Sequence, residues 1–434
     1  MSTIVGKGEK HSLFYGWVVV VVCFLCAFSY GLFYTIGVFF KPLQTEFGWS
    51  YTLTSSIHSL HITAFILSTV LVGWSTDKFG PRLTILWGGT LIALGMGLCS
   101  QVNTIGQFFL FYGLASLGAG IELSLPTATV QRWFIKRRGL ALGITLAGVG
   151  AGTVVYAPIS NYLILAQGWR MSYVIMAIAT WGILMIAATL IRKSPEEKGL
   201  KPYGADEVVA QSDTTEAKEG KPKLWQAQEC TFGEALKTKT FWLLSIMYFC
   251  AILPIYMVMV HIVPAAINFG IDKSAAAGAL ALVGGISIAG RIIMGTSAEK
   301  LGWERGLIIG CGMCGVMFLW LLGVKGLLML YIFAIIYGFF YGGNVPLFPG
   351  LIGFYFPGKS LATIIGAAHA FALIGGAIGP LIGGIVIDQT GSYANAFIIG
   401  AAFWAIAAAL AFLVRWRQKL ALPNNPALAS RALF

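Results

Sequence analysis

The sequence predicts an all-α membrane protein with twelve transmembrane helices, arranged as two pseudo-symmetric six-helix bundles. Three observations support this fold class. The 434 residues are 57% hydrophobic and only 11% charged, whereas soluble domains carry about 25% charged residues. Twelve apolar stretches are long enough to cross a bilayer, which takes about 20 residues in a helix. Finally, motifs of the first half of the chain recur in the second half.

The apolar stretches are continuous rather than alternating, which favours helices over the strands of a membrane barrel. In chain order the expected spans cover residues 15–40, 52–74, 83–101, 106–132, 139–165, 170–191, 241–267, 274–298, 307–324, 327–354, 360–387 and 393–414. The first is too long for the apolar part of a signal peptide and has no cleavage site of small residues. We therefore expect it to remain in the mature protein.

One polar stretch divides the spans six and six. Residues 193–238 are rich in Pro, Gly, Glu and Lys and cannot bury a core, which predicts a cytoplasmic linker loop. The expected domains are an N-terminal bundle at 1–192 and a C-terminal bundle at 239–434.

The basic residues are distributed unevenly across the predicted membrane. An even number of spans puts both termini on one side, and 24 of the 29 Lys and Arg residues fall on that side. The positive-inside rule then predicts a multi-pass protein of the cell (inner or plasma) membrane, with both termini in the cytoplasm. The net charge of +12 thus reports topology and contact with the lipid bilayer. It does not indicate nucleic acid, and no obligate protein partner is evident.

The second half repeats the first at an offset of 222 residues. The matching pairs are Gly73 with Gly295, Asp77 with Glu299, Phe47 with Phe269, and Pro158 with Pro380. A six-helix unit is therefore duplicated, with both copies in the same topology. Parallel repeats of this kind favour two bundles that rock about a site at their interface.

Arg291 is a single cation inside an otherwise apolar span. A charge near mid-membrane costs roughly 2.5–3.5 kcal/mol on insertion scales, so it needs a partner or an aqueous cavity. An anion bound by its guanidinium would be such a partner. Two other interpretations are open: the side chain can extend toward the membrane surface, or it can form a structural pair with Glu122.

Glu122 is the one acid placed well inside a predicted span. Burial favours its neutral form, whereas a nearby Arg291 favours the carboxylate. A group balanced in this way is a candidate for proton coupling, because it can take a proton when an anion occupies Arg291 and release it afterwards. A static ion pair is the alternative.

Several stretches resemble known families of membrane transporters. The motif Gly73-x-x-x-Asp77-Lys78-x-Gly80-x-Arg82 and the six-plus-six duplication are similar to the major facilitator superfamily. Within it, residues 15–48 and 132–152 resemble the monocarboxylate transporter family, here as a bacterial member. Oxalate–formate exchangers share much of this pattern. The resemblance covers nearly the whole chain and implies the major facilitator fold and transport of small carboxylates.

The chain departs from these families at three positions. Animal monocarboxylate transporters have an aspartate at the place of Ser287 and a lysine at the place of Tyr34. The oxalate exchanger has a lysine at the place of His369. The resemblance therefore leaves open which residue carries a proton and how much charge the substrate has.

The resemblance and the residue chemistry together give the candidate site. We expect the substrate to contact Arg291, His261, His369, Tyr34, Tyr337 and Tyr341. Arginine binds a carboxylate through two parallel bonds, histidine changes charge near neutral pH, and tyrosine offers a neutral donor with an aromatic wall. The alternatives are neutral core histidines and tyrosines that only pack.

The repeated motif also predicts residues that control conformation. Acids at the membrane edge can cap a neighbouring helix and hold one state shut. We assign this conformational gating to Asp77, Arg82, Glu299 and Arg305.

The function predicted is secondary active transport of a small monocarboxylate of the lactate or pyruvate type, by alternating access and coupled to protons. The alternatives are an oxalate/formate-type exchanger and a non-transporting membrane sensor. An enzyme is not expected, because the sequence has no phosphate-binding glycine loop, nucleophile elbow or metal-ligand spacing. We accordingly predict no cofactor and no metal, and the seven cysteines form no disulfide framework.

Overall fold

The computed structural model describes residues 14–49, 51–205 and 230–421. The first bundle comprises α1 (Tyr15–Ser29), α2 (Gly31–Tyr34), α3 (Ile36–Phe47), α4 (Tyr51–Phe79), α5 (Pro81–Cys99), α6 (Ile105–Gly118), η1 (Ala119–Glu122), α7 (Ser124–Trp133) and α8 (Arg138–Leu190). The second comprises α10 (Phe232–Lys237), α11 (Lys239–Asn268), α12 (Lys273–Leu301), α13 (Trp303–Trp320), η3 (Leu321–Gly323), α14 (Leu327–Tyr355), α15 (Leu361–Thr390) and α16 (Tyr393–Ala421). Between them lies η2 (Pro195–Lys198).

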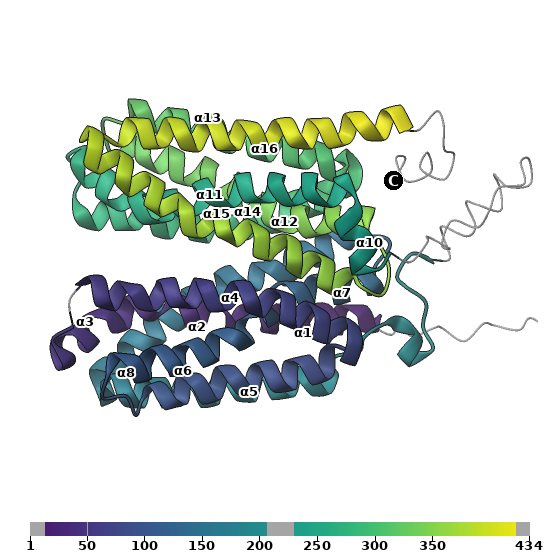
Figure 1. Ribbon diagram of the computed structural model, residues 1–434, viewed down its shortest axis with the longest axis horizontal. Coiled ribbons are helices and arrows are strands. Elements are labelled where there is room, and N and C mark those ends of the chain that lie inside the picture. Colours follow the sequence, from purple (N-terminus) through teal and green to yellow (C-terminus); the bar gives the residue numbers. More distant parts are fainter. Residues whose placement is uncertain (1–13, 50, 206–229, 422–434) are drawn as a thin grey trace, which may run out of the picture.

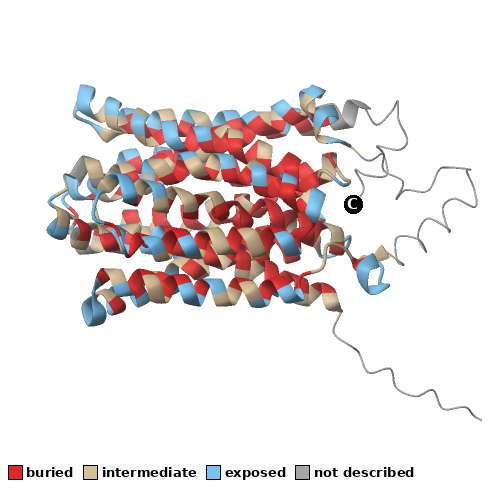
Figure 2. Cartoon of the chain, turned by 60° about the horizontal axis from the view of Figure 1, so that its bottom comes forward, coloured by how far each residue is buried: buried red, intermediate tan, exposed pale blue. Residues whose placement is uncertain are grey.

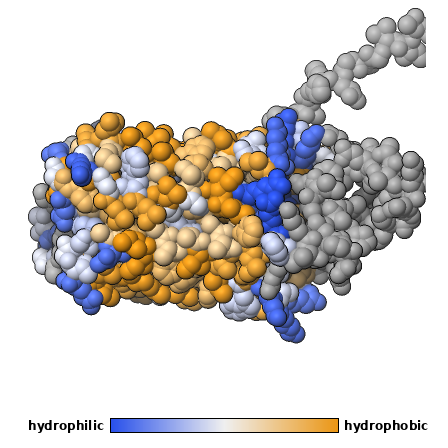
Figure 3. Space-filling view, turned by 90° about the horizontal axis from the view of Figure 1, so that it is seen from above, coloured by the Kyte–Doolittle hydropathy of each residue, from blue (hydrophilic) through white to orange (hydrophobic). Residues whose placement is uncertain are grey.

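The two bundles lie side by side with their helices roughly parallel (Figure 1). Buried residues run along the inward faces of the helices, whereas exposed residues mark the outer faces and the ends (Figure 2). Figure 3 shows hydrophobic side chains over the middle of the visible face and hydrophilic ones gathered at both ends. This distribution is that of a protein surrounded by hydrocarbon along its middle.

The described residues contain 11 helical segments long and apolar enough to span a membrane. One of them, α8, has 53 residues. It would be about 80 Å long if straight, more than twice the hydrocarbon thickness. Its backbone turns at Gly168, where φ is 83° and ψ is 163°, so α8 forms two spans. The total of twelve confirms the predicted fold class.

We call the end at which α1 begins and α8 ends the terminal side, and the opposite end the far side. Both bundles begin and end on the terminal side, as the even number of spans requires. Residues 206–229 of the predicted linker fall outside the described residues, so the domain boundaries stay predictions.

Two expected spans are not continuous helices. The first is broken around Tyr30 and Thr35, where the Thr35 hydroxyl donates to the carbonyl oxygen of Leu32 at 2.6 Å. The fourth is interrupted by the 3-10 turn η1, after which Leu123 has a non-helical φ of −121°. Backbone irregularity at membrane depth is tolerated where protein buries it or where it lines a cavity. Both breaks occur in the first bundle, close to Tyr34 and Glu122.

Candidate functional site

The two bundles are joined on the terminal side through Asp77. From the end of α4 its carboxylate accepts bonds from the first turn of α15: the amides of Ala362 (3.2 Å) and Thr363 (2.7 Å) and the Thr363 hydroxyl (2.6 Å). It also forms a 2.7 Å ion pair with Arg132. The first amides of a helix have no partners within it and carry partial positive charge. Asp77 therefore caps a helix of the opposite bundle.

Glu299 makes the reciprocal contact from the second bundle. Its carboxylate accepts from the amides of Arg137 (3.1 Å), Gly139 (2.8 Å) and Leu140 (3.4 Å) at the start of α8. The repeated acids thus cap each other's bundle. We refer to Asp77, Glu299 and the two helix starts that they cap as the latch.

Other hydrogen bonds between the bundles lie on the same side. Gln131 donates to the carbonyl oxygen of Pro349 at 3.1 Å, and Arg132 donates to that of Lys359 at 3.2 Å. Figure 1 shows α7 and α15 together at this end. In the far halves, the hydrogen bonds found in the described ranges stay within one bundle, such as those of Glu46 with Trp169 and of His261 with Pro380. The structure is therefore a state that is closed on the terminal side.

Closure brings two helix backbones into direct contact. A Cβ atom on Gly295 of α12 would lie 2.5 Å from the carbonyl oxygen of Gly139 on α8. Only hydrogen fits there, so the bundles cannot approach this closely with any other residue at 295.

We expect Gly295→Ala to reduce solute uptake by about tenfold or more, because it forces the closed state apart at its crossing point. The matched control is Gly284→Ala on the same helix, where nothing lies within 4 Å of an added Cβ. Uptake by vesicles and the thermal unfolding midpoint are measured for both variants. Equal uptake by the two would contradict the role of this crossing.

Arg291 lies on α12 at the interface between the bundles. Its side chain is buried, with 4% of the residue exposed. One guanidinium nitrogen, Nη1, donates to the carbonyl oxygen of Leu146 on α8 at 2.8 Å, and Nε has no hydrogen-bond partner. Within the described chain, no carboxylate is at salt-bridge distance from Arg291. The side chain therefore does not extend to the membrane surface, and its charge is only partly satisfied.

Ser287, one turn before Arg291, gives it no counter-charge. The Ser287 hydroxyl donates to the carbonyl oxygen of Gly284 at 2.7 Å. Glu122, which is 7% exposed, is an acid whose charge interacts with that of Arg291. The two form a separated pair across the interface rather than a contact ion pair.

Tyrosines from three elements surround this pair. The phenol of Tyr34 of α2 lies close to that of Tyr256 of α11, across the interface between the bundles. It also interacts electrostatically with Arg291, Glu122 and Tyr341 of α14. Although it has neighbours in both bundles, 43% of Tyr34 is exposed. The group of Arg291, Glu122, Tyr34, Tyr256 and Tyr341, which we call the central cluster, is thus accessible at Tyr34.

His369 is buried next to the central cluster. Its ring stacks on Tyr248 of α11 with centroids 5.5 Å apart and meets the edge of Phe65 of α4 at 5.7 Å. Its Nδ1 atom is buried without a hydrogen-bond partner. This imidazole nitrogen and the Nε atom of Arg291 are both buried polar groups without a hydrogen-bond partner among the described residues.

Two predicted site residues have no described contact with Arg291, although Tyr337 stacks on Tyr341 with centroids 5.9 Å apart. His261 hydrogen-bonds through Nε2 to the carbonyl oxygen of Pro380 at 3.0 Å and packs near Tyr393, all within the second bundle. Tyr337 is 0% exposed and lies between aromatic rings of that bundle, including Phe333 at 5.0 Å. The structure thus gives neither residue a described contact with Arg291, and substrate contact by either stays a prediction.

The predicted arginines of the latch also lie apart from it. Arg82 lines a pocket on the terminal side of the first bundle. The charge of Arg305 acts on its neighbour Glu304. In the described part of the chain neither bonds to the opposite bundle, whereas Arg132, which sequence reasoning assigned to no site, does. Gating by Arg82 and Arg305 therefore remains untested.

Sequence reasoning missed Tyr248, which stacks on His369 and interacts electrostatically with Glu122. Its spacing of eight residues from Tyr256 puts both on neighbouring faces of α11. That spacing is a signal that could have identified it.

Two six-helix repeats, a partly satisfied buried cation at their interface and reciprocal helix caps on one side define a membrane transporter rather than an enzyme. The chain belongs to the Major Facilitator Superfamily, whose sequence profile matches residues 22–328 and 307–432. This membership confirms the resemblance seen in the Gly73–Arg82 motif.

Three relatives found by sequence are named as transporters of carboxylates. Monocarboxylate transporter 12 of Homo sapiens is 27% identical over 404 residues, which cover 89% of this chain and 77% of that protein. Monocarboxylate transporter 13 of Bos taurus is 28% identical over 399 residues, 90% of this chain and 87% of that protein. The oxalate:formate antiporter of Oxalobacter formigenes is 26% identical over 386 residues, 82% of this chain and 84% of that protein.

Solved structures show the same fold. FucP, a transporter of this superfamily crystallised in the outward conformation, aligns with a TM-score of 0.71 at 16% identity, over 92% of this chain and 99% of that one. The proton:xylose symporter XylE aligns with a TM-score of 0.68 at 16% identity, over 93% of this chain and 95% of the XylE chain. At this identity the likeness concerns the fold alone.

Proposed function

We propose that this chain carries small monocarboxylate anions of the lactate or pyruvate type across the membrane by alternating access, with Arg291 as the carboxylate-binding group. The carboxylate-transporting relatives, at 25–28% identity, support the substrate class. The central cluster supports the site.

The observation that carries the proposal is the partial satisfaction of Arg291. A buried guanidinium has five N–H donors, and here it has one described carbonyl acceptor and a free Nε. A carboxylate accepts two parallel bonds from such a fork and neutralises its charge. Binding of a small acid at this point therefore removes an electrostatic cost that the buried guanidinium otherwise bears.

The tyrosines suit the remainder of such a substrate. Phenol hydroxyl groups donate to carboxylate, hydroxyl or keto oxygens, and the rings form an apolar wall for a short alkyl chain. Tyr34 is the exposed member of the central cluster and is therefore the residue that an entering anion meets first.

We further propose that Glu122 couples transport to protons. When an anion neutralises Arg291, the main group that favours the Glu122 carboxylate is lost, and the acid takes up a proton. After the anion leaves, Arg291 again favours the carboxylate and the proton is released. Each cycle then moves one anion with one proton and carries no net charge.

Glutamine is always neutral, so Glu122→Gln cannot take up or release a proton. We expect its uptake to stop responding to an inward proton gradient. Exchange of labelled for unlabelled anion should persist. Uptake by proteoliposomes at equal and unequal pH on the two sides measures both. If a pH gradient still fully drove uptake by Glu122→Gln, Glu122 would not be the proton-coupling residue.

The latch supplies the conformational part of the mechanism. Because Asp77 and Glu299 cap helices only when the terminal side is closed, their bonds stabilise the state open to the far side. By the positive-inside rule we place the terminal side, with both chain ends, in the cytoplasm of a cell (inner or plasma) membrane. Opening inward then requires both caps to break, and only a substrate with different affinity for the two states makes the cycle directional.

One observation favours an exchanger of the oxalate–formate type as the second candidate. The unpartnered Nδ1 of His369 offers a second group for a dicarboxylate, which would be bound more tightly if that imidazole were protonated. Exchange requires no proton carrier. Unlike the proton-coupled transporter, this candidate therefore predicts that Glu122→Gln leaves transport unchanged.

Uptake by proteoliposomes of a panel of labelled mono- and dicarboxylates, with and without a proton gradient, tests the proposed function. We expect monocarboxylates to accumulate with the gradient. Accumulation of oxalate only against internal formate would favour the exchanger, and no accumulation of any carboxylate would favour a sensor.

A further inference from the structure

One pocket lies outside the central cluster, on the terminal side of the first bundle. It has a volume of about 410 Å³ and is formed where α4 passes into α5 and where the chain leaves α8. Four basic residues line it, Lys78, Arg82, Arg192 and Lys193, against one acid, Glu197.

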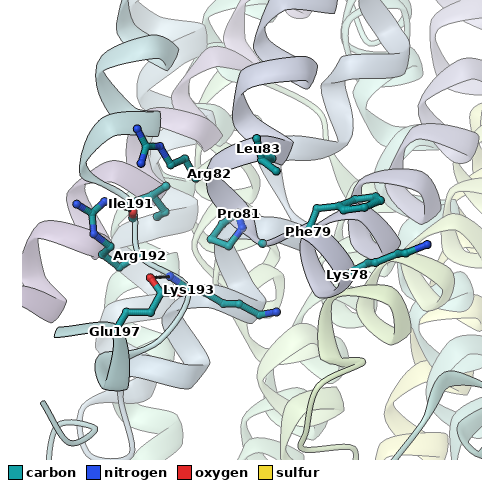
Figure 4. Close-up of a pocket in the computed structure, with 10 residues that line it drawn as sticks. Lys78, Phe79, Pro81, Arg82, Leu83, Ile191, Arg192, Lys193 and Glu197 are labelled. Carbon is teal, nitrogen blue, oxygen red and sulfur yellow. Dashed lines mark hydrogen bonds between the residues drawn. The ribbon is translucent and has the colours of Figure 1, made fainter. Parts of the chain in front are cut away.

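The cations of this pocket are poorly neutralised. Glu197 accepts from the backbone amide of Lys193 at 3.2 Å (Figure 4). The Arg192 guanidinium donates through Nη1 to the carbonyl oxygens of Thr189 (2.9 Å) and Ile191 (2.7 Å), which are neutral groups. Arg82 is exposed and has no hydrogen bond or ion pair with any described residue.

Lys193 shows the same shortage of negative charge. Its ammonium donates to the backbone carbonyl oxygen of Asp77 at 2.8 Å rather than to a carboxylate. Burial and the positive charge of Arg132 lower the pKa of Lys193, and the carboxylates of Asp77 and Glu197 offset this only in part. An anion in the pocket would oppose this shift.

The pocket lies at the boundary between hydrocarbon and water. The spans of α4, α5 and α8 end or begin at Phe79, Pro81 and Leu190, all beside it. Phe79 and Leu83, which also line it, are 50% and 53% exposed. Lys78 extends away from Arg82 and Arg192 in Figure 4 and lies 4.9 Å from the centroid of the Trp74 ring, as cations do at a membrane surface.

From these contacts we propose that the pocket binds the phosphate of an anionic phospholipid headgroup, with Arg82 and Arg192 as its ligands and Lys193 adding positive charge nearby. The cations match a phosphate, and the exposed apolar rim is placed to contact the glycerol and upper acyl chains. A free phosphate ion would use the cations but would gain nothing from Phe79 and Leu83.

Binding of short-chain lipids to the purified full-length chain in detergent tests this site. Native mass spectrometry counts bound dioctanoyl phosphatidylglycerol, with dioctanoyl phosphatidylcholine and inorganic phosphate as comparison probes at equal concentration. We expect phosphatidylglycerol to bind with at least tenfold higher affinity than either.

The double variant Arg82→Gln/Arg192→Gln should lose about tenfold or more of that affinity. Its matched control, Lys237→Gln/Lys239→Gln, removes two exposed cations of the same side at α10 and α11 and should retain it. Because Arg192 also caps the end of α8, Arg82→Gln alone is measured as well and should lose about threefold.

Three results would overturn the proposal. Unchanged phosphatidylglycerol affinity in Arg82→Gln and in the double variant would show that the lipid binds elsewhere. An equal loss in the control pair would show a general effect of net charge. Binding of inorganic phosphate as tight as that of phosphatidylglycerol would make the ligand a soluble anion.

Discussion

Arg291→Ala is expected to reduce monocarboxylate uptake by about 100-fold or more, while the protein still folds. A charge-assisted bidentate contact to a carboxylate contributes about 1.5–3 kcal/mol per bond, and each 1.4 kcal/mol is a factor of ten in affinity. Folding should survive, because the described contacts of the guanidinium are a single bond to the carbonyl oxygen of Leu146. Removing an incompletely satisfied buried charge costs little or even stabilises the fold.

Two further variants sharpen this prediction. Arg291→Lys keeps the charge but not the planar fork, so we expect it to retain only a few per cent of the uptake. Lys325→Ala removes one exposed cation in the loop before α14 and should transport like the parent. Uptake is measured in proteoliposomes, and folding by gel filtration and the thermal unfolding midpoint. Undiminished uptake by folded Arg291→Ala would refute its role.

Asp77→Asn is expected to have the second largest effect, on the closure of the terminal side. The carboxylate accepts from Arg132, from two amides of α15 and from the Thr363 hydroxyl. An amide side chain turns one acceptor into a donor and leaves Arg132 without its described counter-ion. A loss of about 3 kcal/mol, the value of one or two charge-assisted bonds, shifts the equilibrium by about 100-fold toward the state open on the terminal side.

Hydrogen exchange of the first turn of α15 measures this effect directly. The amides of Ala362 and Thr363 are protected by Asp77 in the closed state, so they should exchange at least tenfold faster in Asp77→Asn. The control is Asp388→Asn, an exposed residue at the far end of the same helix. Equal protection of these amides in both variants would contradict the latch.

Composition and repetition were sufficient to predict the fold. The apolar runs and the offset of 222 residues determine twelve spans in two bundles, and the structure has both. The breaks at Tyr30 and at residues 119–122 were not predicted, because the residues around them are as apolar as those of an uninterrupted helix. Breaks of this kind follow from packing between helices, which hydropathy does not record.

The two charged residues of the candidate site are the part that chemistry alone could predict. Arg291 and Glu122 stand out because charges are costly in a span, and the structure brings them to the same interface. The bond from Arg291 to the carbonyl oxygen of Leu146 could not be predicted. Every residue has a backbone carbonyl, and only the crossing of α8 and α12 brings this one to the guanidinium. Tyr337 and Tyr341 are one turn apart, yet Tyr337 is 0% exposed in its own bundle while Tyr341 belongs to the central cluster.

In the repeated motif, the acids and the arginines differ in their described contacts. Arg82 and Arg305 follow the two latch acids in equivalent motifs, which suggested a shared role. The acids cap helices of the opposite bundle, whereas the arginines have no described bond to it. A motif therefore indicates which residues recur, but the direction of each side chain depends on the neighbouring helices.

Equilibrium binding of labelled lactate and pyruvate to the purified chain tests the central claim most directly, because it separates binding from the conformational cycle. The account predicts saturable binding to the parent protein, no binding of the uncharged amide lactamide, and loss of lactate and pyruvate binding in Arg291→Ala with the fold retained. Binding of either anion to folded Arg291→Ala with the affinity of the parent would show that the carboxylate is held elsewhere.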